Sequence, residues 1–459
     1  MGKEQNRLVL TATSVSFLLL LAWLFAVFFA SDVTPFESWK QQLLNFRCNS
    51  SSKKDAKAIE ISDSLEFLLR RLVRGENRIQ LDTTGFTCDT DINSEVCVAN
   101  GPVRIANNSL TVYIESSQSQ VKRVIRPYPS KLALDYVTPV QIVNGDADHL
   151  PACHFIHDVP AVVFSTGGFA GNQFHEFNEL IIPLFITSRH FRSQVKFVII
   201  DYKPWWVSKY SNILSLLTRY EVINPAADGN VHCFPAAVIG LKYHGFLSLN
   251  STDIPGGYSM VDFKRFLREA YSLKIKNVSE IQREKPVLIF ISRGNSRKFL
   301  NEDEMVVMIE ELGFQVVVTR PNRMSNLNKF TEVVNSCSVL VGAHGAGLTT
   351  ELFLPAGAVM VQVVPLGLEW GSTYYFGVPA REMGVQYLEY KTEPEESTLS
   401  ETYSRDDPII TDPASLFAKD YFAARAVYID AQNLKINLTR FRQTIVQAME
   451  HIRMSSPLD

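Results

Sequence analysis

The alternation of short apolar strands with helical periods in the second half of the chain is the feature that most restricts its fold. Runs rich in Val and Ile predict strands, and apolar spacings of three and four predict the helices that separate them. The predicted strands cover residues 286–291, 314–318, 338–342 and 358–364, and the predicted helices cover 302–312 and 326–337. Strict alternation of strand and helix indicates a parallel sheet with helices on both faces.

An earlier segment shows the same alternation. Strands are predicted at 161–165, 195–200 and 236–240, with one helix that begins near residue 171 and another at 207–220. A polar stretch that contains Ile-Pro-Gly-Gly lies between the two segments and is predicted to be a linker. The sequence therefore predicts an α/β protein with two facing Rossmann-like lobes and a cleft between them.

The size and composition of the chain fit a globular protein of several domains. It has 459 residues, of which 46% are hydrophobic and 20% are charged, and these values argue against disorder or a coiled coil. The formal net charge of −3 gives no support for binding to nucleic acid. None of the six cysteines belongs to a Cys-x-x-Cys pair, which argues against a zinc domain.

A span without charges, from Leu8 to Phe29, lies close to the N-terminus. Its 22 residues make a helix long enough to cross a hydrocarbon core of ~30 Å. A cleaved signal peptide is the alternative, but its apolar region is usually only about 7 to 15 residues long. Lys3 and Arg7 precede the span and acidic residues follow it, so the positive-inside rule predicts a cytosolic tail and a luminal remainder.

These features divide the chain into six predicted parts. They are a cytosolic tail (1–7), a transmembrane anchor (8–29), a stem with one amphipathic helix (30–80), a first lobe (81–255), a linker (256–285) and a second lobe with a closing helix (286–459). In this division the chain is a type II membrane protein with one span, and the two lobes are luminal.

Two further features fit an oxidising, luminal compartment. Asparagine begins an N-x-S/T glycosylation sequon at Asn49, Asn107, Asn250, Asn277 and Asn437. The six cysteines allow fifteen pairings. The preferred prediction is a disulfide between Cys88 and Cys97, whose short separation would close a small loop, and a buried unpaired thiol is the alternative for any single cysteine.

The loop after the predicted strand at 338–342 resembles a phosphate-binding site. Its sequence, VGAHGAGLTTELF, opens a helix whose free N–H groups and positive dipole end would face an anion. It does not match G-x-G-x-x-G, because residue 350 is Thr, and it does not match the P-loop, so dinucleotide dehydrogenases and P-loop NTPases are disfavoured. His344 in this loop either donates to a phosphate oxygen or satisfies the turn.

Two arginines are predicted at the same edge of the second sheet as this loop. Arg293 and Arg297 follow the strand at 286–291, at the carboxyl edge where open α/β sheets bind ligands. Either arginine alone is more often a solvated charge, but guanidinium forks suit a diphosphate. Together with His344 the pair predicts an anionic ligand.

The helix that begins near residue 171 carries polar side chains opposite its apolar stripe. That face holds Asn172, His175, Glu176 and Glu179. His175 and Glu179 are four residues apart and can touch, so one can orient the other or raise its basicity. An ordinary solvated helix face is the alternative. Pro183 is expected to kink or end the helix.

Two D-x-D triplets raise the question of a divalent metal. They comprise Asp89 with Asp91 and Asp146 with Asp148. Chance supplies about one such triplet in a chain this long. Asp89 and Asp91 also lie outside both predicted sheet edges, so both triplets are predicted to be structural and no metal site is assigned.

Four motifs follow one another in a characteristic order. They are FSTGGFAGNQFHEFNELIIPLF, ISRGNSRKF, GAHGAGLTTELFLPAGAVMVQVVPLG and YYFGVPAREMGVQYLEY. This set resembles plant glycosyltransferase family 61, the xylan arabinosyltransferases and xylosyltransferases of the Golgi, from about residue 88 to 450. The resemblance implies a single-span Golgi enzyme of the GT-B type. It also implies inverting transfer of a pentose from a UDP-sugar to xylan, without a required metal or other cofactor.

The resemblance also implies roles for the candidate residues. Those expected to hold the donor diphosphate are Arg293, Arg297, His344, Gly345, Ala346 and Gly347. Those expected to face the acceptor are His175, Glu176 and Glu179, with His175 or Glu176 as the base and Glu179 as the orienting group. Family members often carry Asp where this chain has Glu179, so the carboxylate reaches further here. Trp370, Tyr374 and Tyr375 pack either on the sugar or in the core.

Several alternatives remain open at this point. The donor could be UDP-GlcNAc, and the acceptor could be a protein-linked glycan. The chain could also be a catalytically silent Golgi glycan-binding partner, although its polar site residues favour an enzyme, or a nucleotide-sugar hydrolase. A homodimer or a Golgi synthase complex is the expected assembly.

Overall fold

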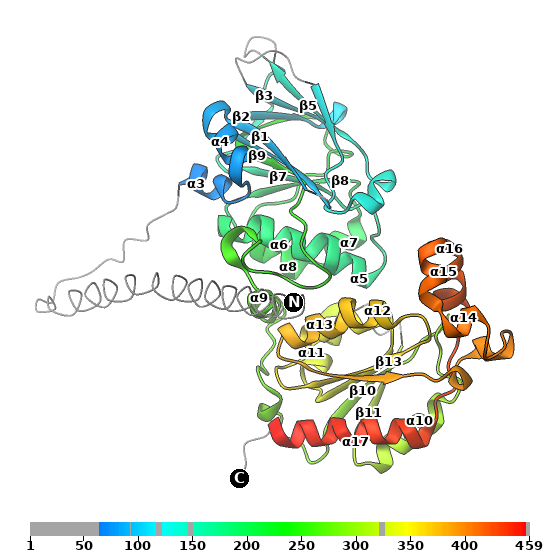
Figure 1. The fold of residues 1–459 in the computed structure, drawn as a ribbon. Coiled ribbons are helices and arrows are strands. Elements are labelled where there is room, and N and C mark those ends of the chain that lie inside the picture. The colour runs from blue at the N-terminus through cyan, green and yellow to red at the C-terminus, as the bar shows by residue number, and fades with distance from the viewer. Residues whose placement is uncertain (1–63, 92, 116–121, 146–149, 321–325, 456–459) are drawn as a thin grey trace, which may run out of the picture. The chain divides into compact units, whose positions relative to one another are not determined.

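The computed structural model describes residues 64–91, 93–115, 122–145, 150–320 and 326–455, and two sheets with flanking helices organise them (Figure 1). The predicted tail, anchor and most of the predicted stem lie outside these residues, as do Asn49, Asp146 and Asp148. Within the described ranges, no helix is long and apolar enough to cross a membrane.

The first lobe is built on a nine-stranded sheet in the order β4-β5-β3-β2-β9-β7-β8, with β1 beside β2 and β6 beside β9. Its strands are β1 (Phe86–Thr90), β2 (Glu95–Ala106), β3 (Thr111–Glu115), β4 (Lys122–Ile125), β5 (Val140–Gly145), β6 (Phe155–Ile156), β7 (Ala161–Ser165), β8 (Lys196–Ile200) and β9 (Val231–Ile239).

This sheet is mixed, which corrects the prediction of a second parallel sheet. The predicted strands became β7, β8 and β9, and these three do pair in parallel. The strands before them were not predicted, and β2 pairs antiparallel with both β9 and β3. Short turns join β1 to β2 and β2 to β3, and a strand that returns through a short turn lies antiparallel to its neighbour.

Helices cover this sheet and begin earlier in the chain than predicted. They are α3 (Leu65–Arg70), α4 (Gly75–Thr84), α5 (Gln173–His175), the π-helix η4 (Glu176–Ile181), α6 (Ile182–Ser188), α7 (Pro204–Lys209) and α8 (Ser211–Leu217). Leu69, Val73 and Leu81 are fully or almost fully buried in the core of the lobe. The amphipathic segment assigned to the stem is therefore part of the lobe, since its apolar face packs against the sheet.

The second lobe contains the parallel sheet that the sequence predicted. Its strands are β10 (Val287–Ile291), β11 (Gln315–Thr319), β12 (Val339–Ala343), β13 (Val359–Val364) and β14 (Gln386–Lys391). They pair in parallel in the order β11-β10-β12-β13-β14. β14 was not predicted, because it is an edge strand with several exposed residues and lacks a continuous apolar run.

Helices lie on both faces of this sheet (Figure 1). They are α10 (Glu302–Glu311), α11 (Leu327–Asn335), the 3-10 helix η9 (Ala346–Phe353), α12 (Glu369–Ser372), the π-helix η10 (Thr373–Gly377), α13 (Val378–Glu382) and α17 (Leu438–Ser455). Alternate residues of β10 serve the two faces: Ile289 joins the core that contains α11, and Phe290 joins the core that contains α17. Burial on both faces explains why this strand is an unbroken apolar run.

The predicted linker contains a core helix, α9 (Met260–Ala270). Ser259 caps it through a capping box with Asp262, and Phe263 and Phe266 are buried on its inner side. The apolar cluster around α9 includes residues of β7 in the first lobe and β10 in the second. The linker prediction was wrong here, because a helical apolar spacing lies between the polar stretches that prompted it.

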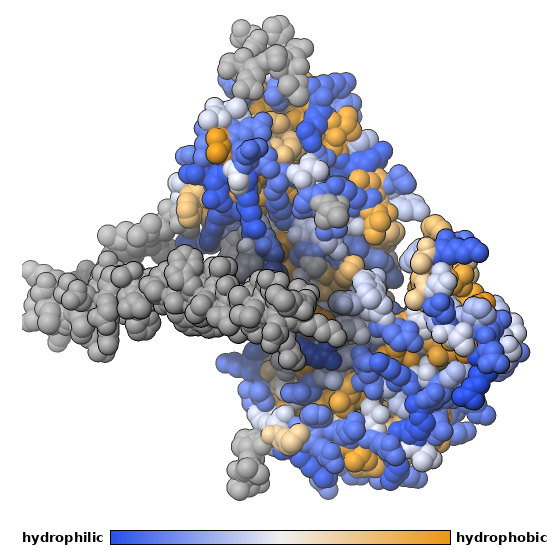
Figure 2. Space-filling view, in the orientation of Figure 1, coloured by the Kyte–Doolittle hydropathy of each residue, from blue (hydrophilic) through white to orange (hydrophobic). Residues whose placement is uncertain are grey.

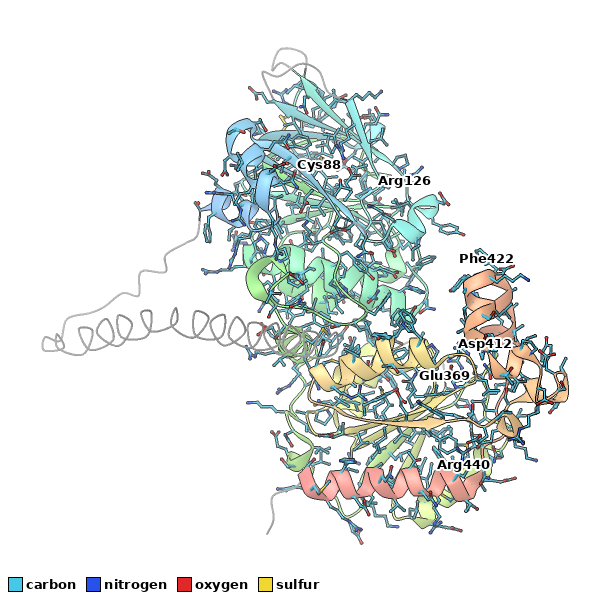
Figure 3. All side chains as sticks on the ribbon, viewed as in Figure 1. Cys88, Arg126, Glu369, Asp412, Phe422 and Arg440 are labelled. Carbon is cyan, nitrogen blue, oxygen red and sulfur yellow. A yellow bond between two sulfur atoms is a disulfide. The ribbon has the colours of Figure 1, made fainter. Side chains whose placement is uncertain are left out.

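A helical segment that the sequence did not predict follows β14. It comprises α14 (Pro408–Thr411), α15 (Pro413–Lys419), α16 (Tyr421–Ala424) and the π-helix η13 (Arg425–Ala431). Tyr428 is fully buried in an apolar cluster of its own with Leu366 and Ile410. Figure 2 shows apolar residues on the surface of this segment, and Phe422, labelled in Figure 3, is 77% exposed.

The structure contains a disulfide between Cys88 and Cys97, the pair preferred from the sequence. It joins facing positions of the antiparallel strands β1 and β2, so it ties a hairpin instead of closing a loop. A second disulfide, which the sequence did not single out, joins Cys153 to Cys233. Cys337 is a buried free thiol.

The sequons differ in their accessibility. Asn250 and Asn437 are exposed and Asn277 is half-buried. Asn107 is only 2% exposed. The prediction of a glycan at Asn107 is therefore corrected, because the folded lobe leaves no room for a sugar at a buried amide.

Candidate active site

The two predicted arginines converge on the loop that follows β12. Arg297 is 8% exposed, and its Nη1 donates to the carbonyl of His344 at 2.9 Å. A Cβ atom at Gly345 would lie 2.4 Å from Nη1 of Arg293 and 3.2 Å from Nη1 of Arg297. Both guanidinium groups therefore lie against the backbone of Gly345, whose φ of 145° also favours glycine.

These two arginines form no close ion pair with a described residue, although Asp430 acts on Arg297 from a longer distance. Among the residues that the structure describes, no carboxylate forms an ion pair with Arg293 or Arg297, and Nε of Arg297 is buried without a hydrogen-bond partner. Burial lowers the pKa of both guanidinium groups, and Arg293 lowers that of Arg297 further. Guanidinium stays protonated in proteins, so the site holds two adjacent positive charges that an anion would stabilise.

His344 lies in this site as a neutral hydrogen-bond donor. Tyr387 donates its hydroxyl to Oε1 of Gln362 at 2.7 Å, so the amide nitrogen of Gln362 faces Nδ1 of His344 at 3.0 Å. Nδ1 therefore accepts, and the proton of the neutral ring is on Nε2. Burial, with the two arginines, lowers the pKa of His344 to about 3, which keeps the ring neutral.

The topology of the second sheet places this group at a binding position. All five strands are parallel, in the order β11-β10-β12-β13-β14. The chain passes from β10 to β11 on one side and then returns to place β12 on the other side of β10, so the order of the strands reverses between β10 and β12. Arg293 and Arg297 follow β10, and His344 follows β12 directly. Open α/β sheets bind ligands at the carboxyl ends of the two strands where the order reverses. Ala346 and Gly347 form the first turn of η9, whose leading N–H groups have no helical partner.

In the first lobe, His175 and Glu179 form a hydrogen-bonded pair. Nδ1 of His175 lies 2.9 Å from Oε1 and 3.0 Å from Oε2 of Glu179, and Tyr128 donates its hydroxyl to Oε2 at 3.2 Å. A carboxylate only accepts, so Nδ1 is the donor and Nε2 carries the lone pair of the neutral ring. The side chain of His175 is 32% exposed, whereas that of Glu179 is 7% exposed.

Glu176 has a different environment from its neighbours on the helix. Its side chain is 1% exposed, and Oε2 accepts from Nζ of Lys209 and from the hydroxyl of Tyr210, each at 2.5 Å. Its Oε1 accepts from the backbone N–H of Gly171 at 3.1 Å. Burial and Glu176 raise the pKa of Tyr210, which keeps that hydroxyl protonated as a donor. This placement favours a structural role for Glu176 over that of a base.

The helix that carries these residues does not end at Pro183. It continues from α5 through the π-turn η4 into α6, with Pro183 in the first turn of α6. Proline lacks the N–H that an α-helical interior uses, and the wider π-turn before it absorbs the missing bond. Of the four polar residues on the predicted face, Glu176 and Glu179 are buried, His175 is half-buried and Asn172 is exposed. The alternative of a solvated helix face therefore holds only for Asn172.

A cluster of aromatic rings connects the His175–Glu179 pair to the anion site around His344. The ring of Phe174 lies 5.4 Å from that of His175 and 5.7 Å from that of Phe376, which in turn lies 5.4 Å from the ring of His344. Tyr375 contacts Phe174 at 5.3 Å. The first-lobe pair and the second-lobe anion site thus lie on opposite sides of one small cluster, which the sequence alone did not reveal.

Other residues considered in the sequence analysis lie outside these two groups or already have partners within the protein. Asp89 pairs with Lys242 and accepts from Asn77, and Asp91 accepts from the backbone of Asn93 and Ser94. These two carboxylates therefore stabilise the β1–β2 region. Trp370 and Tyr374 are 58% and 49% exposed, with ring centroids 5.0 Å apart.

Sequence reasoning missed several residues that support the site. Tyr128 holds Glu179, Lys209 and Tyr210 hold Glu176, and Gln362 fixes the ring of His344. Only Gln362 had a visible signal, as a polar residue inside the otherwise apolar strand β13. The others are distant in sequence from the groups that they contact.

Comparisons with known proteins identify relatives of this chain. The glycosyltransferase 61 family model matches residues 153–361. An α-1,3-arabinosyltransferase of Oryza sativa subsp. japonica is 38% identical over 85% of this chain and 69% of its own length. A β-1,2-xylosyltransferase of the same organism is 36% identical over 80% of this chain and 84% of its own length.

A more distant relative acts on protein. Protein O-linked-mannose β-1,4-N-acetylglucosaminyltransferase 2 of Canis lupus familiaris is 26% identical over 58% of this chain and 47% of its own length. Together the comparisons identify the class of enzyme as a glycosyltransferase. More narrowly, the chain belongs to glycosyltransferase family 61, which confirms the resemblance drawn from the four motifs.

Proposed function

We propose that the chain transfers a pentose, xylose or arabinofuranose, from a UDP-sugar to the backbone of xylan as a side chain, with inversion at the sugar carbon. The observation that carries the donor half of this proposal is the pair of arginines beside His344, which form no close ion pair with a described residue. The acceptor half rests on the similarity to xylan arabinosyl- and xylosyltransferases over most of the chain.

In this mechanism His175 is the base. Its Nε2 takes the proton of the acceptor hydroxyl as that oxygen attacks the sugar carbon from the side opposite the nucleotide. Glu179 holds the ring through Nδ1 and stabilises the imidazolium that forms. The bond to the leaving diphosphate breaks in the same step, which is the single displacement of an inverting GT-B enzyme.

The leaving diphosphate gains charge as that bond breaks. Arg293, Arg297 and the Nε2 proton of His344 supply preorganised positive charge and donors at this point. Loss of one such donor costs about 3 kcal/mol, or on the order of a hundredfold in rate. Because these groups supply the charge that a divalent cation would otherwise bring, we propose that the reaction needs no metal. Activity in excess chelator tests this, and loss that Mn²⁺ restores would contradict it.

Exposed aromatic rings beside the site suit the acceptor. Trp370 and Tyr374 present their faces next to Tyr375, which contacts Phe174 beside His175. The electronegative face of an aromatic ring attracts the polarised C–H groups of a sugar. Replacement of Trp370 by Ala should raise KM for a xylan oligosaccharide and leave donor affinity unchanged, and an unchanged acceptor KM would remove this role.

The decisive experiment presents several UDP-sugars to the purified protein with xylohexaose and identifies the products by mass spectrometry. Pentose transfer to xylohexaose is expected. Transfer of GlcNAc alone would favour the alternative in which the chain resembles the relative that acts on O-linked mannose. Donor hydrolysis without transfer would favour a hydrolase, and no turnover of any donor would favour a silent glycan-binding partner.

We also propose a Golgi location, with the span at 8–29 as a type II anchor and the described residues in the lumen. The two disulfides support an oxidising compartment. Protease added to sealed Golgi vesicles should spare everything beyond residue 40. Digestion of the lobes in intact vesicles would overturn this topology.

A further inference from the structure

A second charged site lies in the first lobe, away from the active site. A cavity of about 440 Å³ is lined by Arg71, Arg189, His190, Arg192, Ser193 and Tyr258. It sits at the C-terminal end of α6, whereas His175 is at the start of the same continuous helix. With a rise of 1.5 Å per residue this separation is roughly 20 Å, too far for the cavity to hold the donor diphosphate.

The arginines give the cavity a strong positive charge. Arg189 pairs with Glu269 at 3.2 Å and lies over the ring of Phe266. In the described ranges, neither Arg71 nor Arg192 has a carboxylate within ion-pair distance. The cavity therefore contains two cationic side chains that nothing in the described protein neutralises.

The arginines that line the cavity also act on Tyr258. Burial raises the pKa of its hydroxyl, while Arg71, Arg189 and Arg192 each act to lower it. Asp262, which caps α9 and pairs with Arg265, is the one acidic group that acts in the opposite direction. All three guanidinium groups thus act on one neutral hydroxyl.

His190 forms part of the wall of this cavity. It is 5% exposed, yet neither ring nitrogen makes a hydrogen bond with any described residue. The carbonyl of Leu68 lies near the ring without the geometry of a hydrogen bond. Burial and Arg71 lower the pKa of His190 to about 4, so the ring is neutral and has one N–H to donate. A buried donor without a partner is costly in a folded protein.

We propose that this cavity binds a small organic oxyanion of monosaccharide size, a sugar phosphate or a uronic acid. Arginine forks bind phosphate and carboxylate oxygens alike. A volume of 440 Å³ lies in the range of small-molecule sites and exceeds what a bare phosphate needs. The site brings together the residue that follows α3, the segment that follows α6, and Tyr258, which lies two residues before α9. Its ligand would therefore bind three separate segments of the chain.

The test uses the full-length chain purified in detergent. Isothermal titration is carried out with glucose 6-phosphate, glucuronic acid, inorganic phosphate and, as a neutral control, glucose. Saturable binding of a charged sugar that weakens with added salt is expected, with little binding of glucose. The phosphate and uronate titrations identify which oxyanion the site prefers.

Variants separate this cavity from the donor site. Arg71→Gln with Arg192→Gln should weaken binding at least tenfold, whereas Arg265→Gln, whose exposed side chain lies outside the cavity, should not. Arg297→Gln should leave this binding intact. If the double variant does not fold, Arg192→Gln alone, at an exposed position, should still weaken binding. Absence of saturable binding, binding that survives the Arg192 change, or binding lost only with Arg297→Gln would overturn the proposal.

Discussion

Nδ1 of His175 lies 2.9 Å from Oε1 of Glu179, and Nε2 of the same ring, whose side chain is 32% exposed, makes no hydrogen bond with any residue that the structure describes. Glu176, one residue further along the helix, is instead enclosed by Lys209 and Tyr210. The two carboxylates of this helix therefore have different roles. Glu179 orients His175, whereas Glu176 connects the helix to Lys209 and Tyr210.

The pair predicts a specific kinetic result. His175→Ala should lower turnover by about two to four orders of magnitude, since no general base then receives the acceptor proton. Glu179→Gln should lower turnover less, because the ring keeps a hydrogen-bond partner but loses the negative charge behind it. Donor affinity, measured by titration, should change little in both variants, since the proposed donor site is in the second lobe. If His175→Ala retained more than half of wild-type turnover, His175 would not be the base.

Glu176 should matter for stability instead of chemistry. Glu176→Gln leaves the ammonium of Lys209 without its buried carboxylate, and breaking a buried pair costs about 3–5 kcal/mol. Urea denaturation should show this loss, with turnover per folded molecule nearly preserved. The matched control is Glu395→Gln, whose pair with Arg405 is exposed and is worth at most about 1 kcal/mol. A folded Glu176→Gln enzyme without turnover would instead restore Glu176 as a candidate base.

The anion site predicts coupled losses of binding and rate. Arg297→Gln should weaken UDP-sugar binding and lower turnover by about a hundredfold, because one preorganised donor is lost. Gly345→Ala should have a similar effect, since the added methyl would displace Arg293. Arg405→Gln, at a position that is 76% exposed, serves as the control in the same titration. Wild-type donor affinity in Arg297→Gln would argue against a diphosphate at this position.

The neutral state of His344 predicts an acid-dependent loss of stability. Its folded pKa of about 3 lies below the value near 6.5 of an unfolded histidine, so between these values the unfolded chain binds a proton that the folded chain does not. His344 therefore does not lower the free energy of unfolding above about pH 6.5. Below that pH it lowers the free energy of unfolding by up to about 1.4 kcal/mol per pH unit. Denaturation of His344→Gln from pH 7.5 to 4.5 should show a shallower slope than wild type. Parallel curves would mean that His344 is protonated in the folded state.

The sequons predict a glycosylation pattern. Asn250 and Asn437 are exposed and should carry glycans when the protein is made in a secretory pathway, whereas Asn107 is buried and should not. Peptide mass spectrometry after enzymatic glycan removal distinguishes the two groups. Modification of Asn107 in correctly folded, active protein would contradict its burial.

The sequence predicted those parts of the fold that depend on local pattern. Largely apolar runs located β10, β12 and β13, because strands buried on both faces are mostly apolar. The same patterns did not locate β2, β3 or β14. β2 and β3 are mostly buried but mix polar residues, and in β2 also Gly and Pro, with apolar ones, whereas most residues of β14 are not buried. The patterns also failed for α9, whose helical spacing lies between polar stretches.

For the site, the sequence by itself determined which residue types lie at the carboxyl edge of the second sheet and which lie on one turn of the first-lobe helix. Arg293, Arg297, His344 and His175 follow from strand ends and helical spacing alone. Only the tertiary structure decided that Lys209 and Tyr210 enclose Glu176 and that Tyr128 holds Glu179, since these three residues come from distant segments. Spacing along a helix fixes neighbours three and four residues away, whereas the environment of a carboxylate depends on long-range packing.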